Sequence, residues 1–147
     1  MQNLSKNVKI SSAITPTAGA AGTTDIEGTA LDMQGFEGVL MVCTFGAITT
    51  NAVTSIKAQQ GAASAMGDAA DLLGTSQTIA DDDDDQTFYI DLYQPEERYV
   101  RLYVDRATQN AVVANALYIQ YGAREAPTSH GTNVSGETHI GITEGTA

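Results

Sequence analysis

The sequence has no tryptophan, a single cysteine and few basic residues, and each of these shortages excludes something. Because Cys43 has no second cysteine to pair with, no disulfide can form within the chain. Only 7 lysines and arginines accompany 18 aspartates and glutamates, which gives a formal net charge of −11. Binding to nucleic acid or to an anionic membrane surface needs clustered basic residues, so we expect neither partner.

Long apolar runs are also missing, since no stretch approaches the roughly 20 residues that a membrane-spanning helix needs. What is present is a chain of 147 residues, which fits one domain. The hydrophobic fraction is 42%, but much of it is alanine. We therefore expect a folded domain with a thin core of Val, Ile, Leu, Tyr and Phe.

Alternation of apolar and polar residues, the pattern of half-buried strands, recurs along the middle of the chain. In Phe36–Phe45 both alternating faces are largely apolar, which predicts a central strand buried on two sides. Further strands are predicted at residues 53–60, 75–80, 87–93, 98–105 and 112–121. The intervening segment 61–74 is rich in small residues, and we leave open a loop or one helical turn around Leu72.

The segment Gln94-Pro95-Glu96-Glu97 separates two of the clearest strands. Proline presets the backbone at the start of a turn, so we predict a hairpin in which residues 88–93 pair antiparallel with residues 99–105. Several short strands without helical periodicity indicate an all-β fold. We expect a β-sandwich, jelly-roll-like in topology.

The two ends of the chain differ from the middle, because they are rich in Gly, Thr, Ser and Ala. We divide the chain into an N-terminal arm (1–22), a β-sandwich body (23–122) and an extended C-terminal tail (123–147). The sparse apolar residues of the two end segments are Val8, Ile10 and Ile14 in the first and Val134, Ile140 and Ile142 in the second. We expect both arms to add little to the fold and to order on a binding partner.

The run Asp81–Asp85 is the most conspicuous local feature. Carboxylates suit calcium, but the run lacks the spacing of a calcium-binding loop, and adjacent aspartates point in divergent directions. Asp68 and Asp71 could add ligands, although capping a turn is the simpler role. We expect a solvated loop and no bound metal.

Candidate catalytic residues are few and poorly placed. Cys43 lies in the most apolar segment, which favours a buried structural thiol over a reactive one. His130 and His139 lie in the tail without a metal-ligand cluster, and the neighbouring Ser129 does not make a triad. We therefore expect no enzymatic activity and no cofactor.

The tyrosines carry more information. If the hairpin forms, one sheet face presents Tyr89, Tyr93, Tyr99 and Tyr103, with Asp91, Arg101 and Asp105 among them. Tyrosine suits interfaces because its ring is apolar while its hydroxyl keeps a hydrogen bond. Simple cross-strand packing on an exposed sheet explains the same pattern, and the sequence does not separate the two.

Three segments, residues 31–40, 98–106 and 116–121, resemble small head proteins that tailed phages encode near the major capsid gene. Proteins similar to these are cement or decoration proteins. The resemblance implies a β-rich fold without catalytic residues and a homo-oligomer, dimer or trimer, bound to the major capsid protein. The expected location is the exterior of the virion capsid, after synthesis in the host cytoplasm.

Two other classes of protein stay open. One is a structural component of a phage tail or baseplate. The other is a carbohydrate-binding β-sandwich module that uses Tyr89 or Tyr103 as a platform for sugar rings, although the absence of tryptophan counts against it.

Overall fold

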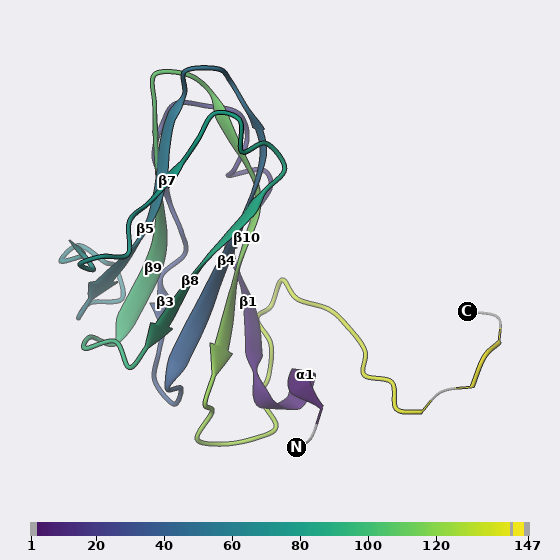
Figure 1. The fold of residues 1–147 in the computed structure, drawn as a ribbon. Helices are drawn as coiled ribbons and strands as arrows, with labels where there is room; N and C mark the ends of the chain where they lie inside the picture. Colours follow the sequence, from purple (N-terminus) through teal and green to yellow (C-terminus); the bar gives the residue numbers. More distant parts are fainter. Residues whose placement is uncertain (1–2, 142, 146–147) are drawn as a thin grey trace.

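The computed structural model describes residues 3–141 and 143–145, and it is a β-sandwich of two antiparallel sheets packed face to face (Figure 1). Strands account for 44% of the residues and helix for 3%, which confirms the predicted all-β sandwich. Ile142, one of the apolar tail residues, lies outside the described residues. No helix in the described part of the chain is long and apolar enough to span a membrane.

Sheet A has four strands and sheet B has six. In spatial order, sheet A consists of β1 (Lys9–Ile14), β10 (Ala111–Tyr121), β4 (Gly38–Ile48) and β8 (Thr87–Tyr93). Sheet B consists of β2 (Ile26–Glu27), β3 (Leu31–Asp32), β9 (Tyr99–Ala107), β5 (Val53–Gly61), β6 (Ala70–Asp71) and β7 (Gln77–Ile79). One short helix, α1 (Leu4–Asn7), precedes β1.

The pairing of the strands is nested. If β2 with β3, and β6 with β7, each count as one interrupted strand, the chain has eight strands. The first pairs with the last, β1 with β10; inside that pair come β2/β3 with β9, β4 with β8 and β5 with β6/β7. A long hairpin rolled up in this way is a jelly roll, so the predicted topology is confirmed.

The core lies between the sheets and is built from inward-facing residues of β4 and β9. Met41 and Phe45 of β4 have no exposed surface, and the Phe45 ring meets Phe88 edge to face at 5.9 Å between centroids. Tyr118 on β10 is also buried, and its hydroxyl accepts a hydrogen bond of 2.9 Å from the Leu102 amide on β9. Tyr118 therefore ties sheet A to sheet B.

Strand β4 is central in sheet A, as predicted, but it is not buried on both sides. Its inward residues are fully buried, whereas Leu40 and Val42 on its other face are half-buried. These two residues face outward from the sandwich. The apolar character of both faces therefore has two causes, a core on one side and an apolar outer surface on the other.

The predicted hairpin is wrong. Strand β8 pairs with β4 in sheet A, and β9 pairs with β5 in sheet B, so the segment between them crosses from one sheet to the other. Their apolar faces both point into the core from opposite sides. Alternation shows which face of a strand is buried, but two strands that meet across a sandwich have the same alternation as two that pair side by side.

The segment 61–74 contains turns and the short strand β6, and it has no helical turn around Leu72. The strand predicted at residues 75–80 is present as β7, and the strands predicted at 53–60 and 112–121 are present as β5 and β10. The short strands β6 and β7 both pair with β5 and complete the outer edge of sheet B.

The N-terminal segment belongs to the sandwich, which corrects the boundary at residue 23. Strand β1 pairs with β10, and Ala13 and Ile14 lie in the core with 3% and 2% of their surface exposed. Farther along, the Gly19 carbonyl accepts a hydrogen bond from the Val113 amide. A Cβ atom on Gly19 would lie 1.9 Å from the Val113 carbonyl oxygen, so only glycine fits there.

A buried arginine holds the rest of this segment against the body. The guanidinium of Arg106, the penultimate residue of β9, donates to the backbone carbonyls of Thr24, Ala20 and Ala111 at 2.7–2.8 Å. The Arg106 amide also donates to the Asp25 carboxylate at 2.9 Å. Residues 9–25 are therefore an integral part of the fold.

The C-terminal tail behaves differently. It runs beside β1 for a few residues, where Thr128 donates to the Lys6 carbonyl at 3.0 Å and Gly131 donates to the Ile10 carbonyl at 2.8 Å. Beyond this contact it leaves the body as an extended segment, drawn in yellow in Figure 1. We call residues 128–131 the strap, because they cover the outer edge of β1.

Candidate interaction surfaces

The aspartate run is used to cap backbone amides. Asp81 accepts from the Asn51 amide at 2.6 Å, and Asp84 accepts from the Ile48 amide at 2.6 Å. Asp83 accepts from the Ala80 amide within its own turn, at 2.9 Å. The run thus fastens its loop to the loop that follows β4, a role that the sequence did not suggest.

Within residues 3–141 and 143–145, no three His, Cys, Asp or Glu side chains are grouped as a metal site would require. Asp68 accepts from the Ala62 amide, the first of the backbone hydrogen bonds that lower the pKa of its carboxyl. Asp71 lies on β6, where its carboxylate accepts a hydrogen bond from Gln59 and pairs with Lys57. The structure therefore brings none of these acidic residues together.

The candidate catalytic residues are also separated. Cys43 has no exposed surface, and burial raises the pKa of its thiol to about 12, which confirms a buried structural cysteine. His139 is exposed and lies 3.2 Å from Glu137 within the tail. Ser129 is exposed in the strap, and the polar contacts of the two histidines go elsewhere, to the Ile10 amide and to Glu137.

His130 has a structural role that the sequence did not reveal. Its Nδ1 atom accepts a hydrogen bond of 3.1 Å from the Ile10 amide, in the middle of the strap. The imidazole thus satisfies an edge amide of β1 that would otherwise face solvent. The histidine fixes the point at which the tail is attached.

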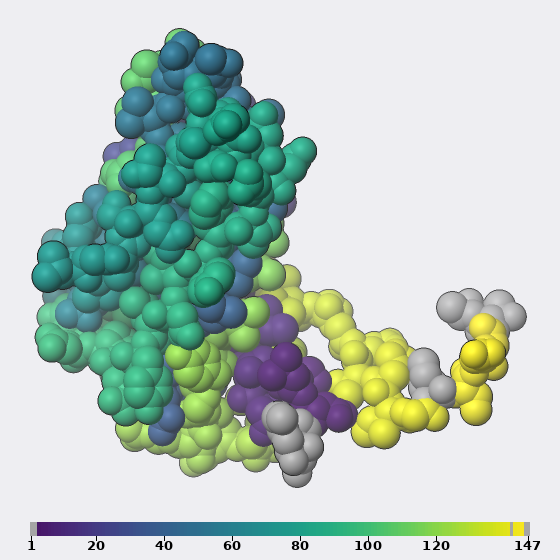
Figure 2. Space-filling view, viewed as in Figure 1, coloured from purple at the N-terminus to yellow at the C-terminus, as the bar shows by residue number. Residues whose placement is uncertain are grey.

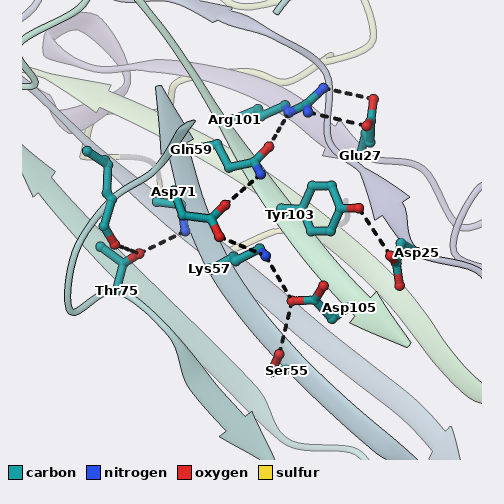
Figure 3. Close-up of polar contacts among 12 residues, drawn as sticks. Asp25, Glu27, Ser55, Lys57, Gln59, Asp71, Thr75, Arg101, Tyr103 and Asp105 are labelled. Atoms are coloured by element: carbon teal, nitrogen blue, oxygen red, sulfur yellow. Dashed lines mark hydrogen bonds and ion pairs between the residues drawn. The ribbon is translucent and has the colours of Figure 1, made fainter. Parts of the chain in front are cut away.

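The outer face of sheet B is charged, and its polar side chains form a continuous network (Figure 3). Arg101 holds Glu27 with two hydrogen bonds of 2.8 and 3.2 Å, and donates to Gln59 at 2.7 Å. Gln59 in turn donates to Asp71 at 2.7 Å. We call this surface the charged face. Its residues are Asp25, Glu27, Ser55, Lys57, Gln59, Asp71, Arg101, Tyr103 and Asp105.

Lys57 and Tyr103 extend this network across β5 and β9. The Lys57 ammonium lies 3.0 Å from Asp71 and 3.4 Å from Asp105, and the hydrogen bond to Asp71 is the main reason why the pKa of Lys57 is raised. The Tyr103 ring lies between two cations, with Lys57 at 4.8 Å and Arg101 at 5.7 Å from its centre. Both cations of the charged face, Lys57 and Arg101, are thus paired with carboxylates of the same face.

The outer face of sheet A has almost no charge. Cross-strand pairing aligns two rows of side chains, Ile10–Ile119–Leu40–Asp91 and Ser12–Leu117–Val42–Tyr89, each running from β1 to β8. Asp91 is the single charged side chain in these rows, and its carboxylate accepts a hydrogen bond of 2.6 Å from the Tyr121 hydroxyl. We call this surface the neutral face. It consists of the two rows together with Thr44, Thr87, Tyr93, Asn115 and Tyr121.

The predicted tyrosine face is wrong as one surface, because the hairpin on which it depended does not form. Tyr89 and Tyr93 lie on the neutral face and are 64% and 61% exposed. Tyr99 and Tyr103 lie on the opposite side of the sandwich, on β9 of sheet B. Of the residues expected among them, Asp91 accompanies the first pair, and Arg101 and Asp105 accompany the second.

The sequence contains a signal for the neutral face. Leu40, Val42, Leu117 and Ile119 occupy alternate positions that do not face the core. An apolar second face on two neighbouring strands is also the pattern of a surface that binds a partner.

The tail forms the third surface. Figure 2 shows residues beyond the strap standing clear of the body. Near its base, the tail and α1 enclose an open groove of about 540 Å³ lined by residues that include Lys6, Ile10, Val134 and Ile140. The Ser5 and Thr138 hydroxyls, 2.8 Å apart, bridge its two walls. Ile140 itself is 79% exposed.

Comparison with known proteins identifies the fold and leaves the family open. No protein-family model matches the chain, and neither does any curated protein. Among solved structures, the PBSX exported protein XepA is similar with a TM-score of 0.52 and 15% identity. The likeness covers 98% of this chain and 46% of XepA, so the chain spans about half the length of that protein.

A second solved structure, PirA, is similar with a TM-score of 0.36 and 14% identity over 78% of this chain and 93% of PirA. A likeness at that level does not define a shared fold. The likeness to XepA is one of overall fold, and it says nothing of what this chain binds.

Proposed function

We propose that the chain is a structural virion protein, a cement or decoration protein that binds the major capsid protein and stabilises the capsid shell of a tailed phage. The observation that carries the proposal is the tail, which is anchored by the strap and then leaves the sandwich with exposed apolar side chains such as Ile140. An extended segment of this kind can add a strand to a neighbouring subunit. The choice of a phage capsid rests on the sequence resemblance.

In this proposal the protein lies on the capsid exterior after synthesis in the host cytoplasm. It binds only the assembled shell, and binding to one state of an equilibrium shifts the equilibrium towards that state. Many copies multiply a modest contact into high avidity. The proposal needs no catalysis, cofactor, nucleic acid or membrane, and the acidic chain is self-repelling until a specific surface binds it.

Co-sedimentation with mature capsids tests this function. The full chain should sediment with capsids in a fixed stoichiometric ratio. A variant that ends after Gly131 should keep the melting temperature of the full chain and lose most of its capsid occupancy. The matched control replaces residues 132–147 with a Gly/Ser segment of equal length, and it should lose occupancy to the same extent. Full occupancy of both variants would contradict a docking role for the tail.

The alternative functions give different outcomes in related experiments. A tail or baseplate component should sediment with phage tails and not with capsids. A carbohydrate-binding module should bind on a glycan array and lose binding in Tyr89→Ala. Tyr103 is the weaker platform of the two, because two cations already flank its ring.

A further inference from the structure

The neutral face is an apolar surface that the fold itself leaves uncovered. Leu40, Val42, Leu117 and Ile119 alternate with the core residues of β4 and β10, so they point away from the other sheet. They are half-buried by one another, and at the β8 edge Tyr89 is largely exposed. Contiguous apolar surface of this kind marks a place where another molecule binds.

Charge favours a second copy of the chain as that molecule. Each copy has a formal charge of −11, so two copies repel one another in most relative orientations. The charged face carries four carboxylates against two cations, Lys57 and Arg101. The neutral face carries only Asp91 among its described residues, and a tyrosine hydroxyl already binds that carboxylate. Two neutral faces can therefore approach at the lowest electrostatic cost.

The rows of the neutral face also have a polarity. The row through Leu40 begins at Ile10 on β1, which lines the tail groove together with Lys6 of α1, and ends at Asp91 on β8. A two-fold axis parallel to the strands places the β8 edge of one copy over the β1 edge of the other. This arrangement brings each Asp91 towards the partner's Lys6, and it lays Val42 of one copy over Leu117 of the other.

We infer that two copies of the chain associate through their neutral faces in this isologous arrangement. The inference rests on the proposed function in one respect, since the resemblance behind that function implies a homo-oligomer, but it does not depend on the capsid. The tail borders this interface at the β1 edge, where Val134 and Ile140 line a groove with Ile10.

Sedimentation velocity of the full chain, without capsids, tests the interface. The wild type should convert from monomer to dimer as the protein concentration is raised. Val42→Lys and Leu117→Asp should each weaken dimerisation about a hundredfold, because each buries an unpaired charge twice per dimer. Thr78→Lys, on an exposed position of β7 beside the charged face, is the matched control and should dimerise as the wild type does.

Mixing the two variants checks that loss of association is not loss of fold. In the inferred register, Lys at 42 of one copy faces Asp at 117 of the other, so an equimolar mixture should recover the dimer. Each variant alone should keep the far-UV spectrum and melting temperature of the wild type. A wild type that is monomeric at every concentration, or a dimer that neither variant weakens, would overturn the inference.

The outcomes separate this inference from the proposed function. A monomeric wild type whose capsid occupancy falls in Val42→Lys would mean that the capsid covers the neutral face, which overturns the inference and leaves the function intact. A wild-type dimer that never sediments with capsids would support the interface and contradict the function.

Discussion

The two ends of the chain have similar compositions but opposite structural roles. Residues 9–25 are built into the sandwich through strand β1, the close approach of Gly19 and the hydrogen bonds of Arg106. Residues 132–141 leave the body after the strap and contact it at few points. Composition therefore does not decide whether a Gly- and Thr-rich segment is an arm. The decisive factor is whether the body offers partners for its backbone.

The contrast between the two ends is tested most sharply by adding a side chain to one glycine in each of them. In Gly19→Val the new Cβ would collide with the Val113 carbonyl, so we expect a loss of about 3 kcal/mol in the free energy of unfolding. Gly136→Val in the tail is the control, because no atom lies within 4 Å of its Cβ position. Urea denaturation measures both. Equal stability of the two variants would mean that the N-terminal segment is as loosely attached as the tail.

A second test removes the arginine that fastens the N-terminal segment. Arg106→Met keeps a long side chain but leaves the carbonyls of Thr24, Ala20 and Ala111 without their donor, so we expect a loss of about 2 kcal/mol. Arg124→Met, at an exposed position after β10, should change stability by less than about 0.5 kcal/mol. Thermal unfolding compares the pair. A neutral Arg106→Met would show that these hydrogen bonds add nothing net.

The strap is the intermediate case between the two ends. His130→Ala removes the acceptor for the Ile10 amide, and we expect a loss of about 1 kcal/mol together with faster hydrogen exchange at that amide. In His130→Asn the side-chain amide oxygen replaces Nδ1 and should restore part of the protection. If the Ile10 amide exchanges equally fast in all three proteins, the strap is not attached as described.

The smallest expected effect is a loss of stability in alkaline solution, and it comes from Tyr121, the last residue of β10. Burial and the hydrogen bond to Asp91 raise the pKa of Tyr121 to about 12. The ordinary tyrosine pKa is about 10, so the unfolded chain releases this proton first, and the stabilisation is lost as the pH rises from about 10 to about 12.

Because water screens this partly exposed hydroxyl, we expect the contribution to be less than about 1 kcal/mol. The measurement is the melting temperature against pH for the wild type and for Tyr121→Phe. Tyr118, whose pKa burial also raises, titrates in both proteins and serves as the internal reference. Identical profiles would remove Tyr121 as a source of the effect.

The sequence predicted the strands well and their partners poorly. Alternation located β4, β5, β8, β9 and β10, because half-burial imposes a period of two. The hairpin of β8 with β9 was wrong, since period-two residues such as Ile90 and Val100 face the same core whether strands pair or face one another. Partner choice depends on chain entropy and loop geometry, which alternation does not record.

The same limit applies to the surfaces. A reader of the sequence can see that Val42 is apolar, but only the register with β10 and β8 shows that it shares a face with Leu117 and Tyr89. Likewise Arg106 looks like any other strand arginine until residues 20–25 fold over it. Groups that act through contacts distant in sequence have no local signature.

The nested pairing of strands has a consequence for the order in which the protein folds during synthesis. Strand β5 and its partners β6 and β7 are close in sequence, so they can pair early. Strand β1 must wait for β10, which is synthesised after the other nine strands. Until β10 is in place, β4 has no neighbour on one side in sheet A, and the apolar side chains of β1 have no partner in their own chain. The emerging chain therefore passes through a stage in which another copy's β10 competes with its own for β1. Widely spaced ribosomes on the message would favour correct closure.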